Sequence, residues 1–411
     1  MARINQARLL DDLREFATFG AYKTGVHRPT FSPQDMESRR WLASRYEAAG
    51  LSASIDGIGN VFGRVAEPGP RLLAGSHAES QNYAGWLDGA LGVIYALEVA
   101  RAFREDPDCE GLHIEPVAWA DEESHFLPFL GTRSFIGDLD DEEIASACNR
   151  TTGEPLTAAL AAAGLAGRAR ERCDAERYVG YIEAHIEQGD VLESTGRRIG
   201  VVTSIVGIQQ YRLSFSGEQN HAGTTRMAAR KDAGMALVAM CNRINETFER
   251  LKGERTVWTV GNISLDPGAP AIVPGGAQML FQFRDEDDAI IARLDQALRD
   301  LVGEADRQGP CRASIDLLSS SKPSRMLPAF QDAFDEAAER EAPDAHIRMP
   351  SGAGHDAQIV SKVLPCGMLF VPSVDGISHH WTENTSDEDI VLGCQVFADA
   401  AKAILRSAAG R

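Results

Sequence analysis

The stretch RLLAGSHAESQNYAGWLDGALGVIYALEVARAF, residues 71–103, decides the fold class that we predict for this chain. It begins with a strand-like run over 71–76 and ends with a segment, 89–103, that is apolar nearly all round, as a buried helix should be. Further strand-like runs lie at 61–65 and 114–118. This alternation predicts an α/β fold, with a mostly parallel sheet sandwiched by helices.

The order of the predicted elements changes over residues 208–325. There the pattern runs strand, helix, strand, strand, helix, strand, which is the split βαβ arrangement of an α+β domain. The earlier pattern then returns, with a helix over 327–340 and a buried strand, CGMLFVP, over 366–372. We therefore expect one domain built from 1–207 and 326–411, with the second domain inserted into it.

Composition limits the classes of protein to which the chain can belong. Its 411 residues are enough for two domains, and the net charge of -19 argues against nucleic acid or an anionic membrane as a partner. No apolar run approaches the length of a membrane span. The seven cysteines are scattered and form no C-x-x-C pair, which predicts reduced thiols and a cytoplasmic location.

Five side chains of the kind that bind metals stand where predicted strands give way to loops or helices: His77, Asp88, Glu123, His185 and His379. Ligands so far apart in sequence cannot form a finger-type site, which needs short spacings. They can converge in an open α/β sheet, because such sheets gather their sites at the carboxyl ends of the strands. With Glu122 beside Glu123 to hold or activate a water molecule, the pattern predicts a hydrolytic two-metal centre.

Each of these residues also has a structural interpretation. Asp88 alone would more often be the N-cap of the helix that follows, and His77 alone would more often be a structural histidine. The acidic run 121–123 alone would be an exposed loop. His185, in the middle of YIEAHIEQG, is by itself an even choice between a ligand and a strand residue.

Six segments in one order make the metal interpretation specific. They are GSHAES…LDGALG, ADEES, EAHIEQG, NHAGTT, PSGAGHDA and GISHHWTE. Together they resemble the carbamoylase branch of the dinuclear-metal amidohydrolase and peptidase superfamily, which includes N-carbamoyl-L-amino-acid hydrolases, β-ureidopropionases and allantoate amidohydrolases. The resemblance runs from about residue 25 to residue 400.

The resemblance implies a role for each residue of the centre. His77 and His185 would hold one metal ion, Glu123 and His379 would hold the other, Asp88 would bridge the two, and Glu122 would be the catalytic acid and base. Two divalent ions per subunit are implied, with zinc first and manganese, cobalt or nickel as alternatives. The neighbouring His380 leaves a one-residue ambiguity, which the Ser-His order of the motif resolves in favour of His379.

The resemblance also implies a homodimer in which the inserted domain, 208–325, serves for dimerisation and as a lid. His221 would stabilise the oxyanion in the active site of the partner subunit, although alone it would be taken for a surface-loop histidine. Arg284 would grip the substrate carboxylate with a bidentate pair. The further substrate-binding candidates are Gln188, Gly352, Gly354, His355, His380 and Trp381, and the two glycines also suit an ordinary turn.

The chain departs from the family pattern at Glu79, Ser124, Arg226, Ala271, His380 and Trp381. Glu79 stands where relatives have Asp and is expected to orient the His77 imidazole from a longer stem. Ala271 stands where relatives carry an Asn that helps bind the substrate carboxylate, the task given to Arg284. The departures leave every expected metal ligand in place, but they favour a substrate other than an ordinary N-carbamoyl amino acid.

The sequence therefore predicts a metal-dependent amidohydrolase that cleaves a linear C–N amide bond, of the N-carbamoyl or ureido kind, in a small carboxylate. An N-acyl-amino-acid amidase or a dipeptidase with the same centre is the alternative. The motif EAHIEQG, with His where many peptidases have Glu, favours the carbamoylase branch. A non-catalytic binding protein on the same fold is a remote alternative, since such proteins usually lose a ligand or the base.

Overall fold

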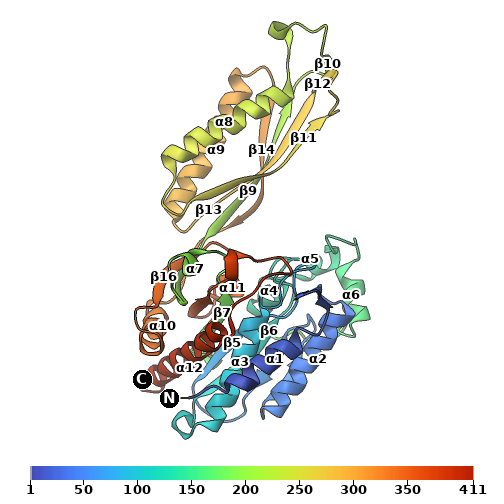
Figure 1. Cartoon of the computed structure of the whole chain (residues 1–411). Helices are drawn as coiled ribbons and strands as arrows, with labels where there is room; N and C mark the ends of the chain where they lie inside the picture. Colours follow the sequence, from blue (N-terminus) through green and yellow to red (C-terminus); the bar gives the residue numbers. More distant parts are fainter. Residues whose placement is uncertain (1, 411) are drawn as a thin grey trace. The chain divides into compact units, whose positions relative to one another are not determined.

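The computed structural model describes residues 2–410 and divides the chain into two compact units (Figure 1). Unit 1 contains the residues up to Thr203 and from Arg325 onward, and unit 2 is Ser204–Ser324. Unit 2 differs from the expected inserted domain, 208–325, by four residues at its start and one at its end. The chain thus leaves unit 1, forms unit 2, and returns.

A nine-stranded sheet forms the centre of unit 1. Its order is β15 (Ser324–Arg325), β8 (Ile199–Ile205), β17 (Cys366–Val371), β7 (Gly180–Ile186), β5 (Arg71–His77), β6 (His113–Trp119), β4 (Val61–Arg64) and β3 (Ser52–Ile55), with β16 (His346–Ser351) paired to β8. The central strands β17, β7, β5 and β6 are parallel, as predicted. The pairs β8–β17, β3–β4 and β4–β6 are antiparallel.

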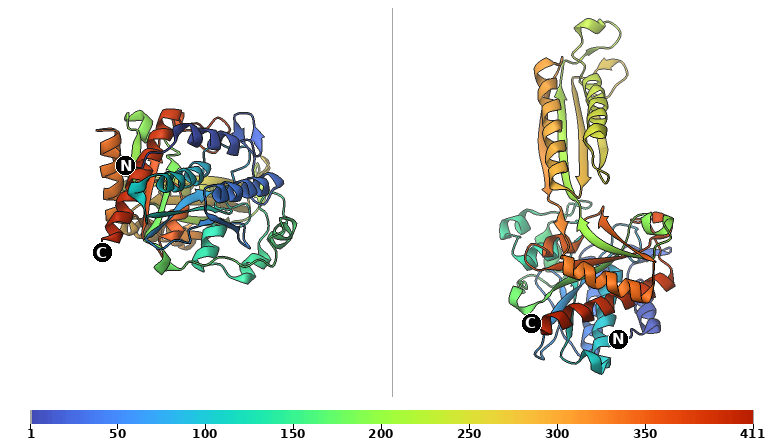
Figure 2. Two further views of the ribbon diagram at one scale, coloured as in Figure 1. Left: turned by 90° about the horizontal axis from the view of Figure 1, so that it is seen from below. Right: turned by 90° about the vertical axis from the view of Figure 1, so that its left-hand side faces the viewer.

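Helices cover both faces of this sheet (Figure 2). One face carries α1 (Gln6–Phe16), α2 (Pro33–Ala48), α3 (Ala90–Glu105), α10 (Pro328–Glu341) and α12 (Asp387–Ala409), and the other carries α4 (Leu130–Ile136) and α11 (Asp356–Val360). Nearly every residue of α3 is buried, because it packs on β5 and β6 beneath α1 and α12. The sequence pattern of an all-round apolar helix is confirmed.

Short elements complete unit 1. They are β1 (Ala21–Tyr22), β2 (Gly25–Val26), α5 (Asp141–Ser146), α6 (Leu156–Ala162), α7 (Val191–Ser194), and the 3-10 turns η1 (Pro107–Cys109), η2 (Ala175–Arg177) and η4 (Val374–Gly376). The seven cysteines are free thiols. Among residues 2–410, no helix combines the length and the apolar character needed to cross a membrane.

Unit 2 is a four-stranded antiparallel sheet with two helices, α8 and α9, packed on it. Its elements are β9 (Gly207–Ser216), α8 (Ala233–Leu251), β11 (Val257–Asp266), β13 (Gly276–Asp285), α9 (Asp288–Gln308) and β14 (Arg312–Ser321), with the short β10 (Asn220–His221), β12 (Ile272–Val273) and η3 (Met227–Ala229). The predicted strand and helix order is the observed one. The sheet order is β11-β13-β9-β14, and alternate residues of β9 and β13 are buried against the helices.

The core of unit 2 is expected to be sensitive to loss of volume. Leu298 in α9 is fully buried in this core, so Leu298→Ala should lower the free energy of unfolding by about 2–5 kcal/mol. Leu318 in β14 is 40% exposed, and Leu318→Ala should change stability by no more than about 0.5 kcal/mol. Urea unfolding followed by circular dichroism measures both. Equal shifts of the two midpoints would contradict the core described above.

Candidate metal centre

The parallel strands β17, β7, β5 and β6 are neighbours, so their carboxyl ends share one edge of the sheet. His77 is the last residue of β5, and His185 is the last but one of β7. Glu122 and Glu123 follow β6, His379 follows β17 and η4, and Asp88 precedes α3. The structure therefore brings together six residues that the sequence spreads over about three hundred positions.

Asp88 lies at the middle of this group. Its Oδ1 is 3.6 Å from Nε2 of His77 and 3.1 Å from Nε2 of His185, while its Oδ2 is 3.2 Å from Nε2 of His379. Asp88 makes no capping bond to α3, whose N-cap is Gly89. Each of its two oxygens thus faces a different set of histidines, which is the arrangement that a bridging carboxylate needs.

The centre contains three sets of residues, and within each set the donor atoms all lie within 4.8 Å of one another. They are His77, Asp88 and His185; His77, Glu122 and Glu123; and Asp88, Glu123 and His379. His379 is the histidine that faces the carboxylates, whereas Nδ1 of His380 lies 2.7 Å from the Thr382 hydroxyl. The geometry agrees with the choice of His379 over His380.

Hydrogen bonds at the far side of two imidazoles define which nitrogen faces the centre. Nδ1 of His77 donates to the carbonyl of Glu79 at 3.1 Å, and Nδ1 of His185 donates to that of Ile186 at 2.9 Å. A carbonyl only accepts, so in each neutral ring the proton is on Nδ1 and the Nε2 lone pair points to Asp88. A cation between each Nε2 and Asp88, either a proton or a metal ion, would satisfy both groups.

The electrostatics of the group lead to the same requirement. Burial alone would lower the pKa of His77, but the carboxylates of Asp88, Glu122 and Glu79 outweigh it and hold that pKa well above its usual value. Burial and the charge of Asp88 raise the pKa of Glu123 to about 7. Its buried Oε1 has no hydrogen-bond partner among the described residues. Imidazoles and carboxylates with excess negative charge fit divalent cations of the transition series.

Burial also acts on the predicted base. It holds the pKa of Glu122 well above the usual value, against the pull of the His77 charge and with the help of Glu123. Oε2 of Glu122 lies 3.9 Å from Nε2 of His77. A carboxylate whose pKa is raised toward the working pH can both take up and release a proton.

The backbone at residue 89 must approach the centre closely. Gly89 has a φ of 67°, and a Cβ there would lie 2.4 Å from the ring of His77. Its N–H points to Nε2 of His185 at 3.2 Å. Only glycine fits at this position, which explains the Asp-Gly pair in the motif.

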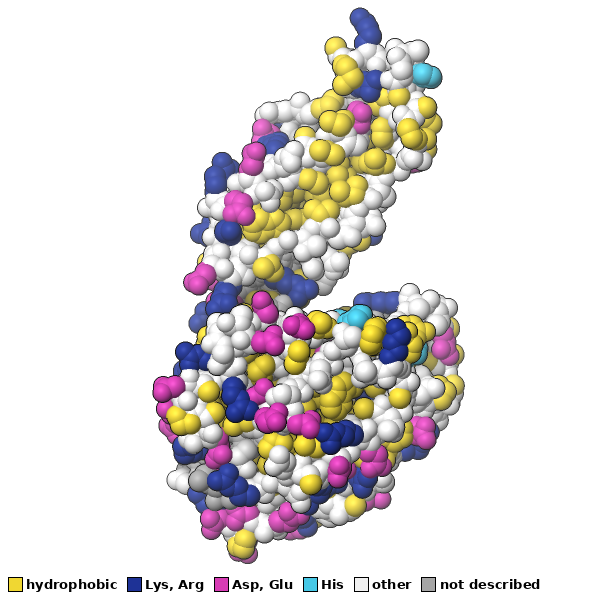
Figure 3. All heavy atoms as spheres, viewed as in Figure 1, with side chains coloured by type: hydrophobic (Ala, Val, Ile, Leu, Met, Phe, Trp, Pro, Cys, Tyr) yellow, Lys and Arg dark blue, Asp and Glu magenta, His cyan; other side chains and the backbone are white. Residues whose placement is uncertain are grey.

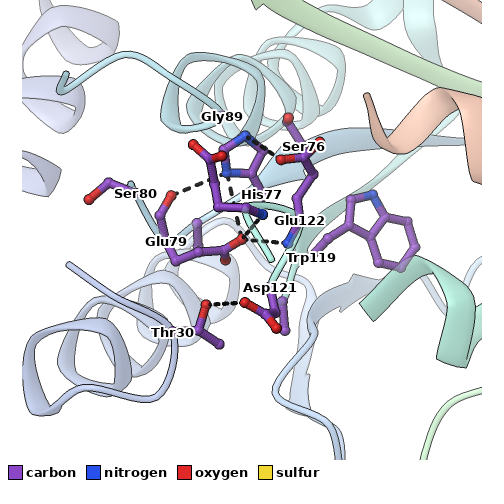
Figure 4. Close-up of polar contacts among 12 residues, drawn as sticks. Thr30, Ser76, His77, Glu79, Ser80, Gly89, Trp119, Asp121 and Glu122 are labelled. Carbon is purple, nitrogen blue, oxygen red and sulfur yellow. Dashed lines mark hydrogen bonds and ion pairs between the residues drawn. The ribbon is translucent and has the colours of Figure 1, made fainter. Parts of the chain in front are cut away.

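The role expected for Glu79 is wrong in one respect. Its carboxylate lies 3.8 Å from Nδ1 of His77, too far for a hydrogen bond, and the imidazole is held by the main-chain carbonyl of Glu79 instead. The Glu79 carboxylate accepts the N–H of Glu122 at 2.6 Å (Figure 4). The longer stem of Glu carries the carboxylate away from the ring and toward the turn that follows β6.

Two residues that the sequence analysis did not single out hold the centre together. Glu383 is buried, and its Oε1 accepts the N–H of Asp88 at 3.1 Å while its Oε2 accepts the Ser378 hydroxyl at 2.9 Å and the N–H of His379 at 3.3 Å. Gln81 donates from Nε2 to Oε2 of Glu123 at 2.8 Å. The signal for Glu383 was present, since it ends the segment GISHHWTE.

The substrate-binding candidates of unit 1 surround the same group. Gln188, at a φ of 57°, donates from Nε2 to Asp88 Oδ2 at 3.3 Å. The ring of His355 lies 4.5 Å from that of His185, and burial lowers its pKa well below the usual value, so it is neutral. Gly352 and Gly354 lie in the loop before α11, and His380 and Trp381 follow His379, with their rings 5.0 Å apart.

The other two candidates belong to unit 2 and lie at opposite ends of its sheet. Arg284 pairs with Ile208 near one end of the β13–β9 ladder. His221 pairs with Ile272, beyond the other end of the ladder at Gly276. The N–H of Ala222 donates to the carbonyl of Ala271 at 2.9 Å. Ala271 is thus a neighbour of His221, and within one chain it lies at the other end of the sheet from Arg284.

Comparison with known proteins agrees with this geometry. Residues 77–403 match peptidase family M20/M25/M40. The chain is 34% identical to an N-carbamoyl-L-amino-acid amidohydrolase of Paenarthrobacter aurescens, over 97% of this chain and 98% of that protein. It is 31% identical to an allantoate amidohydrolase of Escherichia coli K12, over 93% and 94%.

A crystal structure gives a similar result. An amidase of the hydantoinase/carbamoylase family from Burkholderia phymatum is 48% identical and superposes with a TM-score of 0.92, over 98% of each chain. The family, the fold and the motif order therefore agree. This chain belongs to peptidase family M20/M25/M40, in the branch that contains the carbamoylases and allantoate amidohydrolases.

Proposed function

We propose that this protein is a metal-dependent amidohydrolase that cleaves a linear C–N amide bond, of the carbamoyl or ureido kind, in a small carboxylate. The observation that carries the proposal is the position of Asp88, which faces three histidines while Glu122 and Glu123 stand beside it. The similarity to a carbamoylase and to an allantoate amidohydrolase favours a linear amide over a peptide as the substrate of this protein.

His77 and His185 would hold one divalent ion, and Glu123 and His379 would hold the other, with Asp88 between them. We propose zinc, with manganese, cobalt and nickel as alternatives that the same donors accept. Bound ions would supply an electrophile for the scissile carbonyl and lower the pKa of a water molecule. Gln81 and Glu383 keep the donors in place from behind.

Glu122 is the proposed acid and base. Its carboxylate takes a proton from the attacking water and transfers it to the leaving nitrogen as the C–N bond breaks. For an N-carbamoyl substrate, the products are an amino acid, carbon dioxide and ammonia. His221 would donate to the oxygen that becomes negative in the tetrahedral intermediate, and Arg284 would hold the carboxylate.

We further propose a homodimer formed through unit 2. The edge strand β11 pairs on one side only, with β13, and exposes Val257, Ile263 and Leu265. Met235 and Val238 of α8 are exposed as well, and apolar side chains gather along unit 2 (Figure 3). A long apolar edge invites aggregation unless another chain covers it, and a second copy of the same edge fits a two-fold interface.

The distance between His221 and Arg284 supports action across this dimer. The eight residue steps from Gly276 to Arg284 span roughly 25 Å at the rise of a β-strand, and His221 lies beyond Gly276. A small carboxylate amide cannot touch both residues of one chain. We therefore propose that each active site uses Arg284 of its own subunit and His221 of the other.

Residues beside the centre suggest a substrate that is larger or more polar than a simple carbamoyl amino acid. Trp381 is two residues from His379, and its carbonyl accepts the hydroxyl of Thr24 at 2.7 Å. The ammonium of Lys23 lies 4.1 Å from the Trp381 ring centroid and 5.3 Å from that of Tyr22. Aromatic rings with a cation can bind a polar or planar group of the substrate.

We also propose a cytoplasmic location. The seven thiols, scattered over the chain, are all unpaired. Reduced cysteines are typical of the cytoplasm, whereas secreted proteins usually pair theirs.

Metal dependence and the base are tested together. A chelator should abolish turnover, and a divalent ion should restore it. Glu122→Gln should retain its metal and lose turnover by roughly 100- to 10,000-fold, because the proton acceptor is removed. Asp88→Ala should lose metal. Turnover assays and elemental analysis measure these effects, and normal turnover by Glu122→Gln would overturn the mechanism.

Subunit complementation tests the position of His221. Glu122→Gln and His221→Ala homodimers should each be nearly inactive. A mixed dimer has one site in which both groups are intact, so mixing should restore part of the activity. Subunit exchange is checked by native mass spectrometry. If exchanged samples stay inactive, His221 does not act in the other subunit's site.

The carboxylate clamp is tested with a pair of substrates. Arg284→Ala should lower kcat/KM for the acid by roughly tenfold or more, since a charge-assisted bond contributes about 1.5–3 kcal/mol. The neutral amide analogue should be affected little. Steady-state kinetics over a panel of N-carbamoyl, N-formyl and N-acyl amino acids provide the measurement. Equal turnover of the acid and the neutral analogue by the unmodified protein would contradict the proposed binding of the substrate carboxylate by Arg284.

A further inference from the structure

Arg39 is fully buried next to Glu79, outside the set of proposed metal ligands, so metal binding does not account for an arginine at this position. Arg39 of α2 donates from Nε to both oxygens of Asp35 at 3.0 Å and from Nη2 to Oε2 of Glu79 at 2.8 Å. Its Nη1 donates to the carbonyls of Gly59 and Trp119 at 2.9 and 3.1 Å. Replacing such buried ion pairs by apolar groups is often neutral or stabilising, so stability alone is a weak reason for this one.

Glu79 connects this arginine to the proposed base. Its Oε2 is held by Arg39, and its Oε1 accepts the N–H of Glu122 at 2.6 Å (Figure 4). The N–H of Glu123 lies 3.5 Å from the same oxygen. One oxygen of the Glu79 carboxylate therefore bonds to the Arg39 guanidinium, and the other bonds to the turn that carries Glu122 and Glu123.

That turn needs an external support. Asp121 and Ser124, on either side of the two glutamates, have φ values of 57° and 64°, a region that costs energy for residues other than glycine. Asp121 is itself anchored, since its carboxylate accepts the N–H groups of His125, Phe126 and Leu127 at 2.7–2.9 Å. Two side chains bond to the main chain of Glu122: the Ser124 hydroxyl donates to its carbonyl at 3.3 Å, and Glu79, from outside the turn, accepts its N–H at 2.6 Å.

We propose that Arg39, acting through Glu79, is a positioning residue for the acid and base Glu122; this inference rests on the proposed function. The guanidinium fixes the Glu79 carboxylate, and the carboxylate fixes the Glu122 main chain. The Glu79 carboxylate forms no hydrogen bond to His77, and its contact with the N–H of Glu123 is long at 3.5 Å against 2.6 Å for Glu122. Its loss should therefore disturb proton transfer at Glu122 and leave metal binding intact. A misplacement of about 1 Å at a reacting group can cost roughly 100-fold in rate.

Glu79→Gln is the first test. The amide is neutral and loses the ion pair with Arg39, while its size is nearly unchanged. We expect kcat to fall roughly 10- to 100-fold with KM little changed, and the metal content and the metal affinity of the apoprotein to equal those of the unmodified protein. Arg39→Lys keeps the charge but cannot form the fork, so it should show the same pattern. Loss of metal from Glu79→Gln would overturn the proposal.

A double-mutant cycle tests whether the effect passes through Glu122. If Glu79 acts only on Glu122, then adding Glu79→Gln to Glu122→Gln should cause no further loss of the residual turnover. Losses that multiply would show that Glu79 acts elsewhere and would overturn the proposal. If Glu79→Gln does not fold, Arg39→Lys takes its place in the cycle with the same two outcomes.

Glu115→Gln is the matched control. Glu115 lies on β6, is fully buried, accepts the N–H of Val65 at 2.9 Å and pairs with Arg64 at 3.0 Å. It should lose stability but keep kcat per folded molecule. Equal losses of kcat in Glu79→Gln and Glu115→Gln would overturn the proposal. Full turnover by Glu122→Gln would instead refute the proposed function, so the two failures are distinguishable.

Discussion

The parallel pairing of β17, β7, β5 and β6 is the constraint on which the site depends. Parallel neighbours require crossovers, and the crossover from β5 to β6 is the buried helix α3. These four strands therefore end at the same edge, and residues after different strands meet there. His77 and His185 stand on the ends of two adjacent strands, which fixes their spacing through main-chain hydrogen bonds.

Gathering carboxylates at a buried edge is costly unless each has a partner. Hydrogen bonds and one buried ion pair offset this cost. Glu383 and Gln81 bind the donors from behind, while Arg39 neutralises Glu79 at a distance from the metal positions. Asp88 and Glu123 are left facing histidines, and the buried Oε1 of Glu123 has no hydrogen-bond partner among residues 2–410. The carboxylates that face histidines thus lie at the place where cations would bind.

Unit 2 answers a different requirement. Its sheet has helices on one face, so β11 and the outer side of α8 are left with exposed apolar side chains. The same sheet separates His221 from Arg284 by nearly its whole length. The proposed homodimer would explain both features, because a partner subunit would cover the β11 edge and would also supply its His221.

Local pattern was enough for the sequence to predict the main strands and helices of both units and the split βαβ order, and the family resemblance added the roles of the six residues of the centre. Hydrophobic periodicity and the glycine after Asp88 are properties of short segments, so they can be seen without a structure. Even so, β3, β8 and β16 were not predicted. β3 is a four-residue edge strand, which depends on its neighbours, whereas β8 has seven residues and lies inside the sheet.

Only the tertiary structure decided which atoms meet. It gives the Glu79 carboxylate to the Glu122 N–H and not to His77, places Ala271 beside His221, and joins Arg39 to Glu79 forty residues away. Such contacts depend on strand register and on the length of one side chain, neither of which is encoded in local periodicity. The sequence by itself determined the chemistry that is present, and the fold decided how it is held.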